Sequence, residues 1–309
     1  MGEPVAVAFL EAAVRLGTPL ALAALGELMT ERSGVLNLGI EGSLIAGALG
    51  AAFGALWSGD ATTGIVMGAV AGFAVAALFA GFTIGLGTDQ VITGTAVSIG
   101  AIGLTGVLYQ AAFGVTGTAL TLPTLGDVDL PLVSQIPVIG PVVFNATPTA
   151  YLSWLLAPLI WWFLFRTTAG LRLRAAGEDP DAAAALGVRV LRTRFWATCF
   201  GGLLAGTAGA HLALAHAGTF AENMSAGRGF IAIAVVVLGM WSPFTVLAAA
   251  LFFGAASALQ FQGQALGLGI PHQVFLALPY LLTLLALGTR FGRAKAPAAL
   301  AAPWPERRP

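Results

Sequence analysis

Lysine is almost absent from this sequence. The only lysine is Lys295, close to the C-terminal end, and alanine follows it. A Walker A phosphate loop needs a lysine directly before a serine or threonine, because the ammonium group contacts the β- and γ-phosphates of the nucleotide. The chain therefore has no such loop, and any ATP hydrolysis that serves this protein takes place in another chain.

Cysteine and charge are also scarce. Cys199 is the single cysteine, which excludes an intramolecular disulfide and a CxxC redox or metal site. Charged residues make up 9% of the chain and the net charge is zero, which leaves no electrostatic footprint for nucleic acid. No G-x-S-x-G occurs, and His211 and His216 lie about 140° apart around a helix. We therefore expect no catalytic residue, no metal site and no enzyme activity in this chain.

Hydrophobic residues dominate instead, at 58%, together with 41 glycines. A soluble domain has roughly 25% charged residues, so lipid must solvate most of this surface. Small residues let membrane helices approach closely, which suits the glycine content. Since a transmembrane helix needs about 20 apolar residues, the sequence predicts an all-α, polytopic transmembrane bundle. The expected spans are 5–29, 38–57, 62–86, 93–113, 149–165, 194–217, 229–242, 243–262 and 273–289.

Some of these spans are interrupted. The seventh is short and ends at Ser242-Pro243, as half of a broken helix or a re-entrant segment would, and residues 30–37 and 87–94 are irregular. Irregular backbone at membrane depth must be buried in protein or line a cavity. We expect nine spans within a range of eight to ten. Residues 31–50 and 222–239 each place a polar, glycine-containing start before an apolar helix, which indicates an internal repeat.

The basic residues predict the orientation. Six arginines lie in residues 166–194 and five basic residues follow position 289, so both segments are expected in the cytoplasm. The N-terminus would then lie outside. We expect a transmembrane domain over 1–290, with a cytoplasmic loop at 166–194 and an outer loop at 114–148. Residues 291–309 are predicted to be a disordered cytoplasmic tail.

The cytoplasmic loop contains a second pattern. Pro180 suits a first helical turn, the acids beside it suit the positive end of the helix dipole, and Gly187 suits a C-terminal cap. The loop therefore predicts a short helix at about 180–186, whose small side chains suit a groove on a partner.

Polar residues within the spans are candidates for a translocation path. Glu11 and Arg15 form a favourable i, i+4 pair, and Asn37 and Glu41 are expected on one face of the second span. Charges at membrane depth face a cavity or each other, so substrate contact and hydrogen bonding between helices both remain open. The candidates are Asn37, Glu41, Gln90, Thr93, Ser98, Asn223 and Arg228.

Three segments give the sequence a family resemblance. These are GELMTERSGVLNLGIEGSLIAGALGA (26–51), RAAGEDPDAAAALGV (174–188) and GRGFIAIAVVVLGMWSP (227–243). They resemble permease subunits of bacterial ABC importers in the ribose and branched-chain amino acid permease family. The resemblance is strongest to nucleoside-importer permeases that work with a basic-membrane-protein type lipoprotein. It extends from the first span to about residue 290.

The resemblance implies partners and a coupling loop. A substrate-binding lipoprotein or periplasmic protein would deliver a small-molecule solute, and a second, non-identical permease would complete the path in the lipid of the cytoplasmic membrane. An ATPase with two nucleotide-binding domains would hold ATP and Mg²⁺, with no cofactor on this chain. Residues implied to dock on that ATPase are Arg174, Gly177, Glu178, Pro180, Ala182, Ala183 and Gly187.

The sequence leaves the solute open. A nucleoside is the leading expectation and a simple sugar the second, and Tyr109, Phe113 and Phe230 are the candidates for stacking on a base. An ion-coupled secondary transporter or channel, with Glu27, Glu41 and Arg228 as relay groups, is the alternative of another class.

Overall fold

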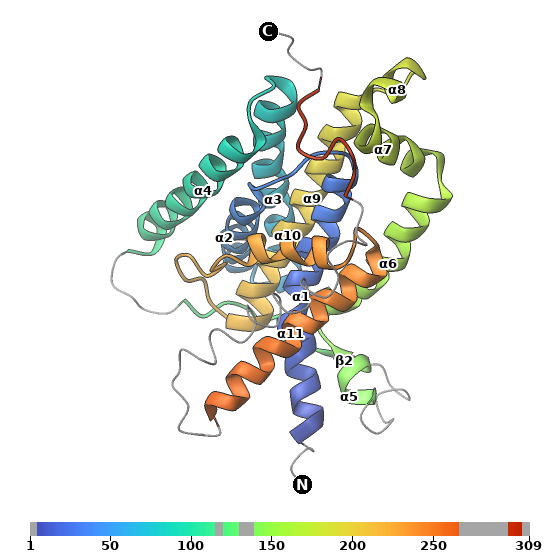
Figure 1. The fold of residues 1–309 in the computed structure, drawn as a ribbon. Coiled ribbons are helices and arrows are strands. Elements are labelled where there is room, and N and C mark those ends of the chain that lie inside the picture. Colours follow the sequence, from blue (N-terminus) through green and yellow to red (C-terminus); the bar gives the residue numbers. More distant parts are fainter. Residues whose placement is uncertain (1–4, 115–119, 130–138, 266–295, 305–309) are drawn as a thin grey trace.

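A computed structural model describes residues 5–114, 120–129, 139–265 and 296–304. These residues form a bundle of tilted helices with one two-residue antiparallel strand pair (Figure 1). The elements are α1 (Val5–Arg32), α2 (Ile40–Ser58), α3 (Ala61–Ala80), η1 (Gly81–Gly85), α4 (Gln90–Phe113), β1 (Val128–Asp129), α5 (Ile139–Phe144), β2 (Asn145–Ala146), α6 (Pro148–Arg166), α7 (Thr168–Glu178), α8 (Pro180–Ala185), α9 (Val190–His211), η2 (Leu212–Ala217), α10 (Arg228–Leu238) and α11 (Pro243–Ala265).

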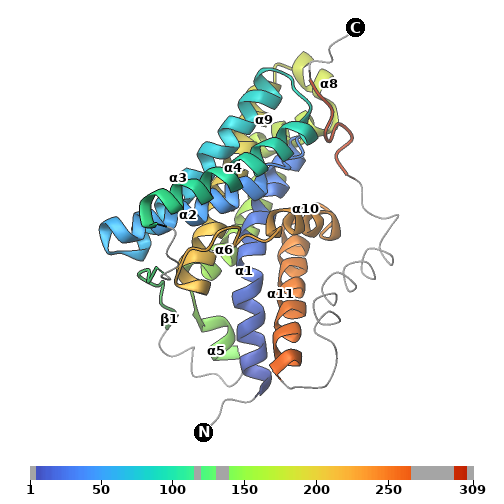
Figure 2. The same ribbon diagram turned by 90° about the vertical axis from the view of Figure 1, so that its left-hand side faces the viewer.

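Seven helical segments are long and apolar enough to cross a membrane, which confirms the polytopic helical fold. They are Ala6–Arg32, Ile40–Ser58, Ala61–Gly85, Gln90–Phe113, Pro148–Arg166, Val190–Ala217 and Pro243–Gln262. The predicted short seventh span is α10, whose 11 residues cover about 16 Å, roughly half of a bilayer core. It runs across the direction of α1 and α11 (Figure 2). The predicted span at 273–289 lies outside the described residues.

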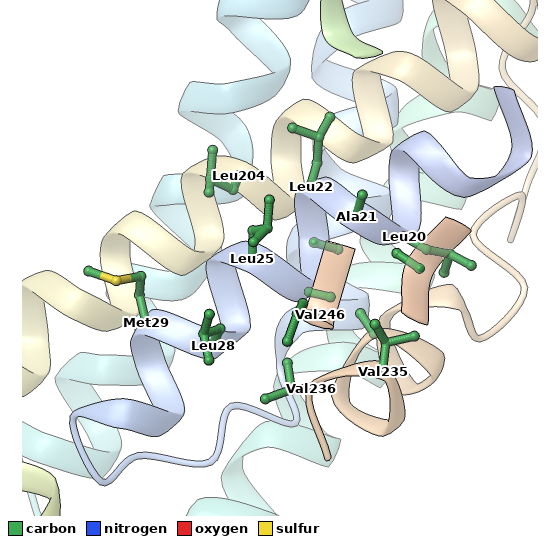
Figure 3. Close-up of a cluster of buried hydrophobic side chains, with 14 of the residues drawn as sticks. Leu20, Ala21, Leu22, Leu25, Leu28, Met29, Leu204, Val235, Val236 and Val246 are labelled. Atoms are coloured by element: carbon green, nitrogen blue, oxygen red, sulfur yellow. The ribbon is translucent and has the colours of Figure 1, made fainter. Parts of the chain in front are cut away.

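Helix α1 lies at the centre of the core. Its residues from Leu20 to Leu25 are almost completely buried, and it packs against α9, α10 and α11. Figure 3 shows leucines of α1 lying between Leu204 of α9 and the valines of α10 and α11. A helix that is apolar all round and buried in this way is the central helix of the bundle, against which its neighbours pack.

Glycine brings α2, α3 and α9 into backbone contact. A Cβ atom added to Gly47 of α2 would overlap the backbone of Gly206 in α9, and one added to Gly72 of α3 would overlap Gly202 and Gly206. Helices this close need glycine at the crossing point, because any side chain would separate them. The expected use of glycine for close packing is confirmed at these positions.

The two ends of the molecule are formed by different elements. Helices α7 and α8 lie at the same end as residues 296–304, and α5 and β2 lie toward the end that holds the N-terminus (Figure 1). At that second end, part of the predicted outer loop is ordered: the Leu122 amide donates to the Gly218 carbonyl at 3.0 Å, and the Leu125 amide donates to the Leu214 carbonyl at 2.9 Å.

Candidate functional site

Helix α8 has the limits that the sequence predicts. Asp179 caps it by accepting a hydrogen bond from the Ala182 amide at 2.9 Å, and Pro180 fills the first position. Gly187 follows with φ +84°, a left-handed conformation that suits glycine. The result is a short, capped helix that the chain enters and leaves in fixed geometry.

One face of α8 has no cover among the described residues. Leu186, just after the helix, is 87% exposed, and Ala182 and Ala185 are exposed beside it. The uncovered face of α8 therefore consists of small and apolar side chains. The sequence analysis missed Leu186, although an apolar residue directly before the capping glycine was the signal for it.

Two of the predicted docking residues face inward. Ala183 is 3% exposed and packs with Ala176 and Val190. A Cβ atom on Gly177 would overlap the Arg32 carbonyl oxygen. The structure therefore gives Gly177 and Ala183 a packing role, and it separates them from the exposed Ala182.

Arg174 and Glu178 fix α7 to its surroundings. The Arg174 Nε donates to the Leu164 carbonyl at 3.0 Å, and its guanidinium lies over the Phe165 ring, 4.9 Å from the centroid. Glu178 Oε2 accepts a hydrogen bond from the Ala298 amide at 3.2 Å. Both residues therefore tie α7 to neighbouring segments, Arg174 to α6 and Glu178 to the tail.

The prediction of a disordered tail is wrong for residues 296–304. The Ala299 amide donates to the Gly177 carbonyl at 2.9 Å, and the Ala301 amide donates to the Gly34 carbonyl at 3.1 Å. Trp304 Nε1 donates to Asp181 Oδ1 at 2.8 Å, and its ring packs on the apolar cluster below α8. Composition alone misled the prediction, because this proline- and alanine-rich segment gains its order from backbone groups on α7 and on the α1–α2 link.

Arg194 joins these parts. It is 2% exposed and donates to three carbonyl groups, those of Ser33 at 3.1 Å, Ala176 at 3.2 Å and Ala302 at 2.9 Å. One guanidinium therefore connects the α1–α2 link, α7 and the tail. The sequence analysis counted Arg194 only as a topology signal.

The turn between α10 and α11 is held by the end of α1. Trp241 Nε1 donates to Glu31 Oε2 at 2.5 Å, and Arg32 donates from Nε and Nη2 to the Trp241 carbonyl at 3.0 and 2.6 Å. Met240 and Trp241 have φ of +55° and +52°. Two successive non-glycine residues in this region are strained, so the surrounding contacts must impose the turn.

Glu41 caps α10. Its Oε1 accepts from the Gly227 amide at 2.8 Å and its Oε2 accepts from the Gly229 amide at 2.6 Å. A carboxylate at the positive end of a helix is favourable. The N-terminal ends of α2 and α10, the helices within the two segments of the predicted repeat, therefore meet at this side chain.

Gln90 and Ser98 of α4 hold the link before α2. Gln90 Oε1 accepts from the Leu36 amide at 2.8 Å, and Ser98 Oγ donates to the Leu38 carbonyl at 2.8 Å. Asn37 lies in this link, so the expectation that it shares a helical face with Glu41 is wrong. Its amide donates to Glu27 Oε1 at 2.9 Å. Asn37, Glu41, Gln90 and Ser98 thus gather around residues 36–42.

The other three candidates make separate hydrogen bonds or lie in the turn before α10. Thr93 hydrogen-bonds Thr88 through the two hydroxyl oxygens, 2.8 Å apart. Asn223 is exposed, with φ +56°, in the turn before α10. Arg228 donates from Nη1 to the Met224 and Ser225 carbonyls of the same turn at 3.0 and 3.2 Å.

Several buried polar atoms in this region have no hydrogen-bond partner among the described residues. They are Glu27 Oε2, Glu31 Oε1, both side-chain polar atoms of Asn37, Ser43 Oγ and Ser225 Oγ. Buried polar groups are almost always paired. This group of residues therefore retains hydrogen-bonding capacity inside the bundle.

Aromatic rings gather elsewhere. The ring centroids of Tyr109 and Phe220 are 5.1 Å apart, those of Tyr109 and Phe113 are 5.4 Å apart, and those of Phe53 and Phe113 are 5.5 Å apart. Tyr109 and Phe113 thus belong to one aromatic cluster. Phe230 is 44% exposed and shares no ring contact with that cluster in the described part of the chain.

Comparison with known proteins identifies the family. The family model for the permease component of the branched-chain amino acid transport system matches residues 9–293. The chain is 37% identical to the guanosine ABC transporter permease NupQ of Bacillus subtilis, over 93% of this chain and 92% of that one. It is 34% identical to the nucleoside ABC transporter permease NupC of Lactococcus lactis, over 91% and 92% of the two chains.

A third relative has another printed substrate. The chain is 39% identical to the putative glucose ABC transporter permease TsgC13 of Haloferax volcanii, over 88% of this chain and 82% of that one. No solved structure matches. The family match over nearly the whole chain, with seven apolar helices behind it, shows that this protein belongs to the permease family of the branched-chain amino acid transport system.

Proposed function

We propose that this chain is the membrane-spanning subunit of an ABC importer for nucleosides, energised by ATP hydrolysis in a separate subunit. The observation that carries the coupling part is α8, a capped helix whose exposed tip, Leu186, is held from behind by α7, Arg194 and the tail. Such a helix transmits force from a docked partner, because its own position is fixed by hydrogen bonds on its inner side.

A continuous route leads from α8 into the bundle. Arg194 links α7 to the Ser33 carbonyl, directly after α1. The end of α1 holds the Trp241 turn through Glu31 and Arg32. That turn follows α10, whose other end is capped by Glu41 of α2. Movement of α8 therefore reaches the helices around residues 36–42 without passing through a flexible loop.

In this proposal the importer works by alternating access. An ATPase with two nucleotide-binding domains holds ATP and Mg²⁺ and docks on residues 166–194, which places that loop and the C-terminus in the cytoplasm. A second, non-identical permease completes the path, and a lipoprotein or periplasmic binding protein delivers the solute to the side of the 114–148 loop. This chain performs no covalent chemistry.

Docking is tested by Leu186→Asp, with Leu186→Met as the matched control. Because Leu186 is 87% exposed, we expect the aspartate variant to fold with unchanged thermal stability. It should lose at least about tenfold in recovery of the ATPase from detergent extracts and in ATP-driven uptake, because a charge replaces an apolar contact. The methionine variant should keep both. Full uptake by Leu186→Asp, or transport down an ion gradient by the lone chain, contradicts the proposal.

The nucleoside assignment rests on the guanosine and nucleoside permeases to which this chain is similar over more than nine-tenths of its length. The cluster of Phe53, Tyr109, Phe113 and Phe220 supplies ring faces of the kind that stack on bases. A sugar is the second candidate, since the putative glucose permease is 39% identical.

Uptake by vesicles that contain the whole complex separates the two solutes. We expect ATP-dependent accumulation of labelled guanosine or uridine, and we expect excess unlabelled nucleoside to suppress it while glucose does not. Accumulation of glucose or ribose without nucleoside uptake would move the assignment to the sugar.

A further inference from the structure

A large apolar groove lies beside the coupling loop. It has a volume of about 680 Å³ and is formed by α1, α6, α7 and α9. Its wall is hydrocarbon and aromatic ring, contributed by Met29, Ile160, Phe163, Leu173 and Phe200 among others. None of the candidate path residues around 36–42 lines it, so the groove is separate from that site.

The groove opens on the outside of the bundle. Leu159 and Trp162 of α6 are 51% and 55% exposed, and Trp196 of α9 is 61% exposed. All three line the groove. Apolar side chains this exposed on membrane-spanning helices face lipid or another protein, and tryptophan is enriched where the hydrocarbon meets the headgroups.

The mouth of the groove is cationic. Arg172 of α7 and Arg192 of α9 both line it, although they come from different helices, and both are exposed. Neither makes a hydrogen bond or ion pair with another described residue, and no carboxylate is among the described groove-lining residues. The groove therefore offers two cations, with no neutralising partner among the described residues, beside a long apolar wall.

Both arginines lie close to the ends of membrane-spanning segments. Helix α6 ends at Arg166, and α7 begins two residues later and turns away from it (Figure 1). Arg172 on α7 and Arg192 in the first turn of α9 therefore lie where spanning segments end and polar helices begin. From there the apolar wall continues along α6 to Leu156.

We infer that this groove binds an anionic phospholipid. Its phosphate lies between Arg172 and Arg192, and an acyl chain packs along Ile160, Phe163 and Phe200. Basic pockets between membrane helices are known to bind anionic headgroups. Because α7 and α9 flank α8 in the chain, a lipid that bridges them also braces the loop that carries Leu186.

Native mass spectrometry of the whole complex tests this inference. The complex is reconstituted in vesicles of equal phosphatidylglycerol and phosphatidylcholine, extracted, and its retained lipids are counted. We expect an excess of phosphatidylglycerol on the wild type, reduced by about tenfold or more in the Arg172→Ala/Arg192→Ala double variant. The matched control is Arg166→Ala/Arg189→Ala, which removes two arginines from the same end that do not line the groove, and it should keep the excess.

A second variant tests the apolar wall without changing charge. Ala169 is exposed and lines the groove, so Ala169→Trp should fill the space, lower phosphatidylglycerol retention and leave folding intact. Equal retention of both lipids by the wild type would overturn the inference, as would an undiminished excess in the arginine double variant. A Leu159→Cys variant that cross-links to another chain of the complex would also overturn it, because the occupant would then be protein.

Discussion

The α7–α8 end and the junction around residues 36–42 differ in how completely their buried polar groups are hydrogen-bonded. At the α7–α8 end, Arg194, the tail amides and Asp179 all find hydrogen-bond partners, and the apolar side chain of Leu186 is 87% exposed. At the junction, Glu41 is fully paired, but Asn37, Glu27 and Glu31 have buried polar atoms without a hydrogen-bond partner among the described residues. The hydrogen bonds of the first region are complete, whereas those of the second leave buried polar atoms available to another partner.

This comparison also distinguishes two kinds of buried charge. Arg194 donates hydrogen bonds to three backbone carbonyl groups, which do not titrate. Glu27 and Glu31 lie one helical turn apart, and in the described part of the chain each has one oxygen hydrogen-bonded and one without a partner. A charge with complete backbone partners stabilises one arrangement, whereas an incompletely paired one favours any arrangement that completes it.

The largest effect is expected from Arg194→Ala. Removing the guanidinium leaves three carbonyl groups without their donor, and an unsatisfied buried group costs about 1–3 kcal/mol. We expect a marked fall in the midpoint of thermal unfolding in detergent and loss of ATP-driven uptake. Arg189→Ala, at the exposed start of α9, is the control and should change the unfolding midpoint little. An unchanged unfolding midpoint for Arg194→Ala would mean that the three hydrogen bonds of Arg194 do not stabilise this region.

A smaller effect is expected from Glu41→Gln. The amide side chain keeps one acceptor oxygen but cannot accept from both Gly227 and Gly229, and it loses the charge at the end of α10. We expect a loss of about 1–2 kcal/mol in stability and a lower maximal uptake rate with an unchanged KM. A raised KM at unchanged stability would instead place Glu41 in contact with the solute.

The smallest effect is expected from Trp304→Phe. The ring can still pack below α8, while the hydrogen bond to Asp181 is lost, which costs about 1 kcal/mol or less. Trp304→Ala removes both contacts and should weaken ATPase stimulation by solute further than Trp304→Phe does. Equal behaviour of the two variants and the wild type would show that the tail does not brace α8.

Local sequence signals predicted much of the fold. Apolar length placed seven spans, and the interruption at Ser242-Pro243 correctly separated α10 from α11. Asp179, Pro180 and Gly187 placed α8, because caps act within one helical turn. The same local signals misjudged residues 296–304, whose order comes from the Gly34 and Gly177 carbonyls more than 100 positions away.

The sequence by itself determined that this protein lies in the membrane, has no phosphate loop and presents a short capped helix, since composition and caps are properties of neighbouring residues. Only the tertiary structure decided which side of α8 is exposed, that Ala183 points inward, that Asn37 lies outside α2, and that Arg194 joins three distant segments. The physical reason is that burial and hydrogen-bond partners depend on which helices meet. The sequence of a helix that is apolar all round does not indicate which neighbour packs on which of its faces.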